Sequence, residues 1–279
     1  MSATLGAALA LAAATTTALA HGLIKSGGDT LATRAAVGLT QSVLAIPLVL
    51  IVGWPDAGLW PWLALSIATH VIYQLVLNHA YQTADFSVAF PLARGVAPLA
   101  TALLGIALLS DRPGLPALAG VLAVSLGLAL IAFRSGMTGG ALAAAATAGL
   151  LTSVYTLIDA QGVRSGAEPL HFIAWFFLLE GPALLPIYLG LRRRAALPLL
   201  LANARRGVTA GVATVIGFGA ALWALALTSA GAVSALRETS VILALAFGAL
   251  VLKERLSPQR ILGGVVVAGG AVLIVLGGG

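Results

Sequence analysis

Apolar residues in this chain form long continuous runs that are separated by short polar or charged turns. Ten of these runs approach the roughly 20 residues that a helix needs to cross the hydrocarbon core of a bilayer. They cover 3–25, 33–53, 61–81, 86–109, 115–133, 141–159, 170–190, 207–228, 232–252 and 259–277. The runs are continuous rather than alternating, which excludes membrane β-strands. Backbone groups in hydrocarbon must be hydrogen-bonded internally, so the pattern predicts ten membrane-spanning helices.

Composition points to lipid as the main solvent of the chain. Hydrophobic residues make up 60% of the 279 residues and charged residues only 9%, whereas soluble domains carry about 25% charged residues. Mean hydropathy is +1.05. The run at 3–25 has no Lys or Arg before it, unlike a signal peptide, so we interpret it as a membrane helix. We therefore expect an all-α polytopic protein that crosses the inner or plasma membrane many times.

The formal net charge of +6 fits either a nucleic-acid partner or a membrane topology. The Lys and Arg residues gather in loops between the apolar runs, above all in 191–206, which is typical of membrane proteins. We expect the lipid bilayer as a partner and no nucleic acid. Because the basic loops follow the first, fifth, seventh and ninth runs, the positive-inside rule places both termini outside the cytoplasm.

Signatures of catalysis are missing from the sequence. Cysteine is absent, which excludes disulfides, thiolate nucleophiles and cysteine-based metal sites. The chain has no HExxH, GxSxG, Walker or GxGxxG motif, and its four histidines have no convincing metal spacing. We expect no enzyme activity, no catalytic residue, no metal and no cofactor, while coupling to protons stays open.

The two halves of the chain align with each other. The segment RGVAPLATALLGIALLSDRPG (94–114) matches RETSVILALAFGALVLKERLS (237–257) without gaps, at an offset of 143 residues (237 − 94). This register pairs Arg94 with Arg237, and it also pairs glycines in the two runs that follow. The sequence therefore predicts an internal repeat.

We place the two repeats at residues 1–135 and 136–279. Each repeat has five predicted helices, an odd number, so the chain enters each repeat on one side of the membrane and leaves on the other. The two copies are then inverted, which is typical of secondary transporters that bind substrate near the membrane midplane. A duplicated membrane protein of another kind is the alternative.

Charged residues inside the apolar runs are the main candidates for a binding site. Arg94, Arg237 and Glu238 lie deep in their runs, and an arginine at a helix centre costs about 2.5–3.5 kcal/mol to insert. Such residues usually face a partner or a water-filled cavity. A guanidinium pairs bidentately with carboxylate and phosphate groups, so two deep arginines favour an anionic substrate. The alternative is a structural ion pair that holds helices together.

A polar stripe follows the third run, where His70, Tyr73, Gln74, Asn78 and Tyr81 share one helical face. It predicts hydrogen-bonding groups for a substrate, and the alternative is a polar seam between helices. Other runs add further polar or aromatic candidates, which are His21, Lys25, Tyr155, Trp175, Glu180 and Trp223. The groups that are candidates for proton exchange are His21, His70, Glu180 and Glu238.

The chain resembles the drug/metabolite transporter superfamily, and within it the EamA-type ten-helix transporters. The residues that carry this resemblance are AYQTADFSVAFPLARGVAPLATALLG with SDRPG, and ALRETSVILALAFGALVLKERLS with GGVVVAGG. The resemblance implies a central cavity lined by the first, third, fourth, sixth, eighth and ninth helices. It also implies cytoplasmic termini, against the loop charges. Small multidrug-resistance relatives have a carboxylate in their first helix, which this sequence lacks, and cation/proton antiport is therefore not favoured.

These observations together predict a fold of ten transmembrane helices as two inverted five-helix repeats around a central cavity. The expected function is secondary active transport, by resemblance export, of small polar anionic or zwitterionic metabolites by alternating access. A monomer suffices for this, and a dimer stays open. The alternatives are a flippase for lipids or lipid-linked head groups, an intramembrane enzyme, and a non-transporting scaffold. The candidate substrate-binding residues are His21, Lys25, His70, Gln74, Asn78, Arg94, Tyr155, Trp175, Glu180, Trp223, Arg237 and Glu238.

Overall fold

The computed structural model describes residues 2–25, 29–83, 86–132, 139–166, 168–243, 245 and 257–277. Within these ranges all regular structure is helical. The long helices are α1 (Ser2–Lys25), α2 (Thr30–Val52), α3 (Trp60–Thr83), α4 (Phe86–Leu108), α5 (Leu115–Ala132), α6 (Gly139–Ser165), α7 (Pro169–Arg192), α8 (Ala196–Leu227) and α11 (Pro258–Leu276), with the shorter α9 (Ala230–Arg237). Two 3-10 turns, η1 (Ala57–Leu59) and η2 (Arg193–Ala195), precede α3 and α8.

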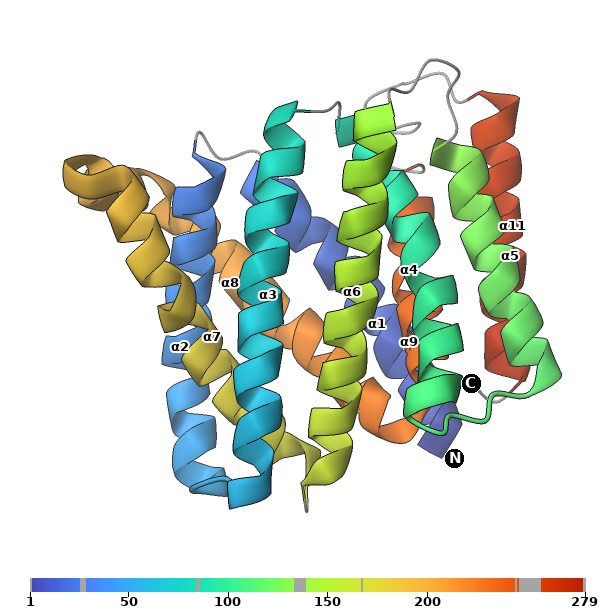
Figure 1. The fold of residues 1–279 in the computed structure, drawn as a ribbon, viewed down its shortest axis with the longest axis horizontal. Coiled ribbons are helices and arrows are strands. Elements are labelled where there is room, and N and C mark those ends of the chain that lie inside the picture. Colours follow the sequence, from blue (N-terminus) through green and yellow to red (C-terminus); the bar gives the residue numbers. More distant parts are fainter. Residues whose placement is uncertain are drawn as a thin grey trace.

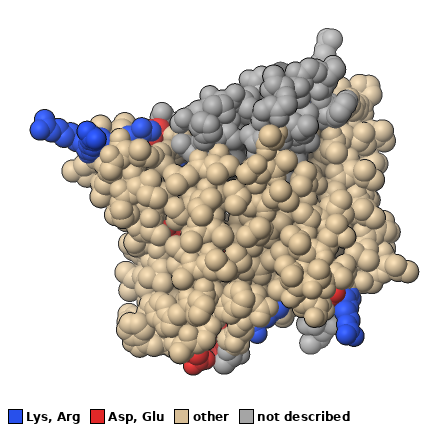
Figure 2. Space-filling view, in the orientation of Figure 1, with Lys and Arg blue, Asp and Glu red and all other residues tan. Residues whose placement is uncertain are grey.

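The helices have the length and surface of membrane helices. Among the described residues, five helical stretches are long and apolar enough to cross a membrane. They are Thr30–Val52, Ala57–Val76, Leu115–Ala132, Pro169–Leu227 and Pro258–Leu276. Leu50 and Ile51 are 79% and 77% exposed, which suits contact with lipid. On the face shown in Figure 2, almost all charged side chains lie at the two ends of the molecule, on either side of a broad uncharged belt. The chain is a polytopic membrane protein, and the count of ten spans stays a prediction.

The helices stand side by side and run alternately up and down through the bundle (Figure 1). The N-terminus and the C-terminal end of α11 lie at one end of the bundle, which is the lower end in Figure 1. The arginine-rich link between α7 and α8 lies at the opposite end. The bundle therefore has a basic end that is remote from both termini, as the loop charges predict.

Helix α8 begins at Ala196, although the sequence pattern predicts a loop at 191–206. This prediction is wrong because the segment is rich in alanine and leucine, which favour a helix. Pro198 falls in the first helical turn, where its missing N–H would have had no partner within the helix. The Tyr188 hydroxyl donates a hydrogen bond of 2.6 Å to the Ala196 carbonyl and fixes the start of α8 against α7.

The ninth apolar run is interrupted, whereas the pattern predicts one helix over 232–252. Helix α9 ends at Arg237, and a turn follows at Glu238 and Thr239. The Glu238 N–H donates to the Ala235 carbonyl at 3.1 Å, and this bond spans three residues instead of the four of an α-helix. Within this run, residues 244 and 246–252 lie outside the described residues. The break falls at the two charged residues of the run, which the following section places at a cavity.

Helices α5 and α11 pack against each other through glycines, at the right edge of the bundle in Figure 1. A methyl group on Gly270 would lie 2.7 Å from the Gly120 carbonyl oxygen, and one on Gly263 would lie 2.7 Å from the Gly127 carbonyl oxygen. Both distances are shorter than a side chain tolerates. The glycines therefore allow the two backbones to approach closely, as small residues do between membrane helices.

Substituting Gly270 by alanine should destabilise the protein by about 1–3 kcal/mol, because the new methyl group overpacks the contact between α5 and α11. The neighbouring Gly269 provides a matched control, since a methyl group there would meet nothing within 4 Å. Thermal unfolding in detergent measures both variants. Equal melting temperatures for G270A and G269A would contradict this packing.

The positive-inside rule predicts that the end of the bundle with the α7–α8 link faces the cytoplasm. The chain has no cysteine, so single cysteines can report its orientation directly. Ala195 and Ala57 are exposed at opposite ends of the bundle. In intact cells, a membrane-impermeant thiol reagent should label Ala57→Cys, and it should label Ala195→Cys only after permeabilisation. The reverse result would place the termini in the cytoplasm.

Candidate functional site

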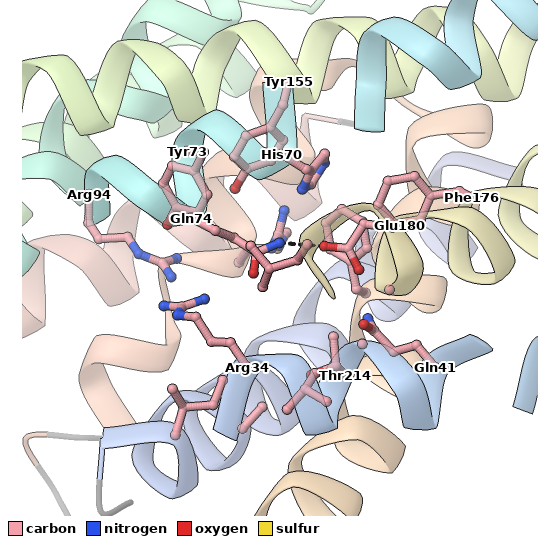
Figure 3. A pocket seen from close by; sticks show the side chains of 18 residues that line it. Arg34, Gln41, His70, Tyr73, Gln74, Arg94, Tyr155, Phe176, Glu180 and Thr214 are labelled. Atoms are coloured by element: carbon pink, nitrogen blue, oxygen red, sulfur yellow. Dashed lines mark hydrogen bonds between the residues drawn. The ribbon is translucent and has the colours of Figure 1, made fainter. Parts of the chain in front are cut away.

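A cavity of about 110 Å³ lies inside the bundle. Its polar lining residues are Arg34, Gln41, His70, Tyr73, Gln74, Arg94, Tyr155, Glu180, Thr214 and Arg237, most of which are shown in Figure 3. Every long helix except α5 and α11 supplies at least one lining residue. The family resemblance predicts a cavity lined by six helices, and the structure adds α2 and α7 to that set.

Arg94 reaches the cavity from α4 and forms an ion pair with Glu238, which follows α9. The Arg94 Nη1 donates to the Glu238 Oε1 at 2.8 Å. Both side chains are buried, so each charge relies on the other for compensation. The break after Arg237 makes this pairing possible while Arg237 itself lines the cavity. The two neighbouring charges therefore serve different purposes, since Glu238 pairs with Arg94 and Arg237 lines the cavity.

Two other arginines line the cavity and are bonded less completely. The buried Nε and Nη2 atoms of Arg34 have no hydrogen-bond partner among the described residues, and neither has the Nε of Arg237. The Arg237 guanidinium carbon lies 5.2 Å from the centre of the Phe218 ring, a cation–π contact that satisfies no N–H donor. Both guanidinium groups therefore line the cavity and keep donors that no described residue satisfies.

An acid stands across the cavity from Arg34 and Arg94. Figure 3 shows Glu180, from α7, on the far side, with Gln74 of α3 reaching toward it. The Gln74 Nε2 donates a short hydrogen bond to the Glu180 Oε1. Gln41, from α2, also lines the cavity and makes no side-chain hydrogen bond to the described residues. The cavity is thus basic at one end and able to accept hydrogen bonds at the other.

His70 forms part of the wall between these two ends. Its Nε2 lies 3.0 Å from the Oδ2 of Asp159, whose Oδ1 accepts a hydrogen bond of 2.5 Å from the Ser66 hydroxyl. Asp159 is fully buried, so it lies inside the bundle beside His70. The His70 ring packs 4.2 Å from the Tyr155 ring and 5.0 Å from the Phe176 ring. The aromatic groups hold the imidazole in place at the cavity.

The structure brings together half of the predicted site residues. Those that line the cavity are His70, Gln74, Arg94, Tyr155, Glu180 and Arg237. Glu238 stands behind them as the partner of Arg94. The side chains of the remaining polar candidates lie outside the described residues, and these candidates are His21, Lys25 and Asn78.

The two predicted tryptophans do not line the cavity. Trp175 donates from its Nε1 to the Gly53 carbonyl at 2.8 Å and packs against the rings of Trp54 and Trp60, at centroid distances of 5.0 and 5.4 Å. This aromatic cluster joins α7 to the turn before α3. Trp223 is 38% exposed. These positions do not support the prediction that the two tryptophans contact substrate. Aromatic residues are also common in membrane proteins at the boundary between lipid and water, where they have no role in binding a substrate.

Sequence reasoning overlooked the contribution of α2. Arg34 lies near the start of an apolar run and resembles a charge at a helix end, yet it is 7% exposed. Gln41 follows it by seven residues and Gly38 by four, so all three share one helical face. That spacing was the available signal. Thr214, from α8, gave no comparable signal because it stands alone among apolar residues.

The arrangement suits reversible binding of a small polar molecule. No group of three or more metal-ligating side chains occurs within the described part of the chain. The cavity offers guanidinium donors, a carboxyl group, amides and aromatic faces, which are the groups that orient a charged ligand.

Comparisons with known proteins agree with this description. Residues 139–276 match the sequence model of the EamA-like transporter family. No curated protein sequence matches the chain. A solved structure, titled only as the crystal structure of a protein, superimposes with a TM-score of 0.69 at 19% sequence identity. The alignment covers 98% of this chain and 96% of the other, so the similarity extends over the whole fold.

The Arg94–Glu238 pair should couple the stability effects of substitutions at its two positions. Arg94→Gln leaves the Glu238 carboxylate buried without its cation, which should cost about 3 kcal/mol or more. The double variant R94Q/E238Q removes both charges and should recover at least half of that loss. A double-mutant cycle of thermal unfolding measures the coupling. Additive losses from the two single variants would contradict a direct pair.

Proposed function

Because the chain belongs to the EamA-like transporter family, within the drug/metabolite transporter superfamily, we propose that it carries small anionic or zwitterionic molecules through its central cavity. Members of this family are membrane transporters and not enzymes. The observation that carries the proposal is the polar cavity itself, which is lined by Arg34 and Arg237, two residues with hydrogen-bonding groups that no described residue satisfies. Anionic oxygen atoms are the ligands that guanidinium groups bind best.

The proposed mechanism is alternating access, in which one half of the bundle rocks against the other. The cavity is lined from both predicted repeats, by residues between Ala20 and Arg94 and by residues between Tyr155 and Arg237. A ligand at this position contacts both halves and is released when they separate on one side. The interruption of α9 at the cavity is also typical of transporter sites, where broken helices expose backbone groups to a substrate.

The glycine contact between α5 and α11 supports the proposed repeat. At the offset of 143 residues, Gly120 corresponds to Gly263 and Gly127 corresponds to Gly270. In the structure Gly120 approaches Gly270, and Gly127 approaches Gly263. Each residue thus meets the equivalent of the other, which is the reciprocal pattern that a two-fold axis produces. We infer that α5 and α11 are the corresponding helices of two inverted repeats.

Export, the plasma membrane as location, and a functional monomer belong to the proposal as well. Coupling to protons through His70, whose Nε2 lies 3.0 Å from the Asp159 carboxylate, also stays a prediction.

Arg237→Ala should abolish ligand binding while the protein still inserts in the membrane and elutes as a single species. The test measures the melting temperature of the purified protein with a panel of amino acids, sugar phosphates, phosphonates and organic cations. A ligand at about 100 times its dissociation constant stabilises the folded state by about 2.7 kcal/mol, which a melting curve resolves. Arg205, exposed on α8, supplies the matched control R205A.

Each outcome of this panel separates the proposal from its alternatives. Stabilisation by an anionic or zwitterionic compound that is lost in R237A and kept in R205A supports the transporter. Stabilisation only by lipid extracts would favour a flippase of the same fold. No stabilisation by any compound would favour a scaffold. Equal stabilisation of wild type and R237A would show that the ligand does not bind in this cavity through Arg237.

A further inference from the structure

The three arginines of the cavity fall into two classes. Arg94 is neutralised by the carboxylate of Glu238, at 2.8 Å. Arg34 and Arg237 make no ion pair with any described residue. Both are more than nine-tenths buried, at 7% and 8% exposure. Within the described part of the chain, two buried positive charges therefore have no ion-pair partner.

The N–H donors of these two side chains are the stronger indication that an anion binds in the cavity. The Nε and Nη2 of Arg34 and the Nε of Arg237 are buried, and no residue that the structure describes is their hydrogen-bond partner. Leaving a buried donor unsatisfied costs about 1–3 kcal/mol, and more when the group is charged. Such a cost is usually offset by a ligand, a water or an ion that binds there. Since both residues line one cavity, a single anion bound there would lie beside both positive charges and balance them.

The opposite end of the cavity limits what else the anion can carry. Figure 3 places Glu180 across the cavity from Arg34, with Gln74 bonded to it and Gln41 nearby. A second anionic group at that end would meet the Glu180 carboxyl. A hydroxyl or an ammonium group would instead donate a hydrogen bond to it. The cavity has a volume of about 110 Å³, which suits a compact molecule.

We propose that Arg34 and Arg237 together form the anion-binding site of the carrier, and that its substrate is a compact molecule with one oxyanion group and a hydrogen-bond donor at the other end. Arg94 holds Glu238 in place and contributes little to the charge of the site. This inference rests on the proposed transport function and names the substrate chemistry of that same cavity. A carboxylate and a phosphate share the chemistry that two guanidinium groups recognise.

The experiment measures thermal unfolding of the purified full-length protein at constant ionic strength, with chloride as the balancing anion. The probes are acetate, glycine, malonate and inorganic phosphate. Acetate or phosphate should stabilise the protein, and the responding probe identifies the oxyanion as a carboxylate or a phosphate. Glycine should bind at least as well as acetate, because its ammonium group can reach Glu180. Malonate should bind at least ten-fold more weakly than acetate, because it carries a second carboxylate.

Four substitutions separate this assignment from a general effect of charge. R34Q and R237Q should each weaken binding of the responding probe at least ten-fold, while R205Q on the surface should leave it unchanged. E238Q should lower the melting temperature without ligand, because it removes the carboxylate beside Arg94. E238Q should also strengthen anion binding roughly ten-fold. This is the effect expected when one negative charge is removed at a distance on the order of 10 Å from the anion in a partly polar interior. The gain in E238Q is a result that a purely structural role of these residues does not produce.

Other results would overturn the inference. Binding that is unchanged in R34Q, or that is weakened in E238Q as much as in R34Q, would show that Arg34 does not belong to the anion site. Malonate binding as tightly as acetate would remove the restriction to one anionic group. Stabilisation by organic cations alone would refute the anion site and leave the transport function standing. If no compound changes the melting temperature, the result would contradict the proposed transport function as well as the anion site.

Discussion

Buried charge without access to water is the constraint on which this structure depends. Hydrocarbon offers neither hydrogen bonds nor counter-ions, so a charge inside the bundle needs a partner on another helix or a bound ligand. The pairs observed are His70–Asp159, Gln74–Glu180 and Arg94–Glu238. They tie α3 to α6, α3 to α7, and α4 to the turn after α9. Polar contacts of this kind select one arrangement of helices, because apolar surfaces in lipid pack almost equally well in many registers.

The two aligned arginines show how a repeat becomes asymmetric. Arg94 and Arg237 occupy the same position of the aligned segments, but the next residue is Gly95 in one and Glu238 in the other. Of these two positions only 238 carries a carboxylate, and this carboxylate pairs with Arg94. Arg237 contacts the face of Phe218 instead. The residue that follows the aligned arginine thus helps to separate a structural cation from one that can bind a ligand.

The outer pair of helices has a different physical role from the helices around the cavity. Gly120 and Gly270 bring α5 and α11 into backbone contact, and neither helix reaches the cavity. Such contacts resist sliding because they leave no room for side chains to adjust. The cavity walls are built differently, from long polar side chains and from α9, which ends at Arg237. We infer a rigid edge beside a cavity whose walls can rearrange.

The sequence by itself determined the solvent of this protein and most of its helices, because long apolar runs admit only helices in hydrocarbon. It also singled out Arg94, Arg237 and the polar face of His70 and Gln74, since charges in such runs are costly and therefore conspicuous. The start of α8 was missed because a cluster of arginines resembles a loop. The break of α9 was missed because no proline or glycine marks it.

Tertiary structure alone decided how these residues are paired. The role of Arg34 at the cavity follows only from the packing of α2, which places this residue in the cavity wall. Trp175 is an aromatic residue in an apolar run, but it bonds to Gly53 and does not line the cavity. Which arginine meets Glu238 depends on where α4 approaches the turn after α9. The two residues are 144 positions apart (238 − 94), so no local pattern in the sequence indicates their contact. Sequence periodicity reports which face of a helix is polar, whereas a pairing depends on the relative positions of helices, which only packing fixes.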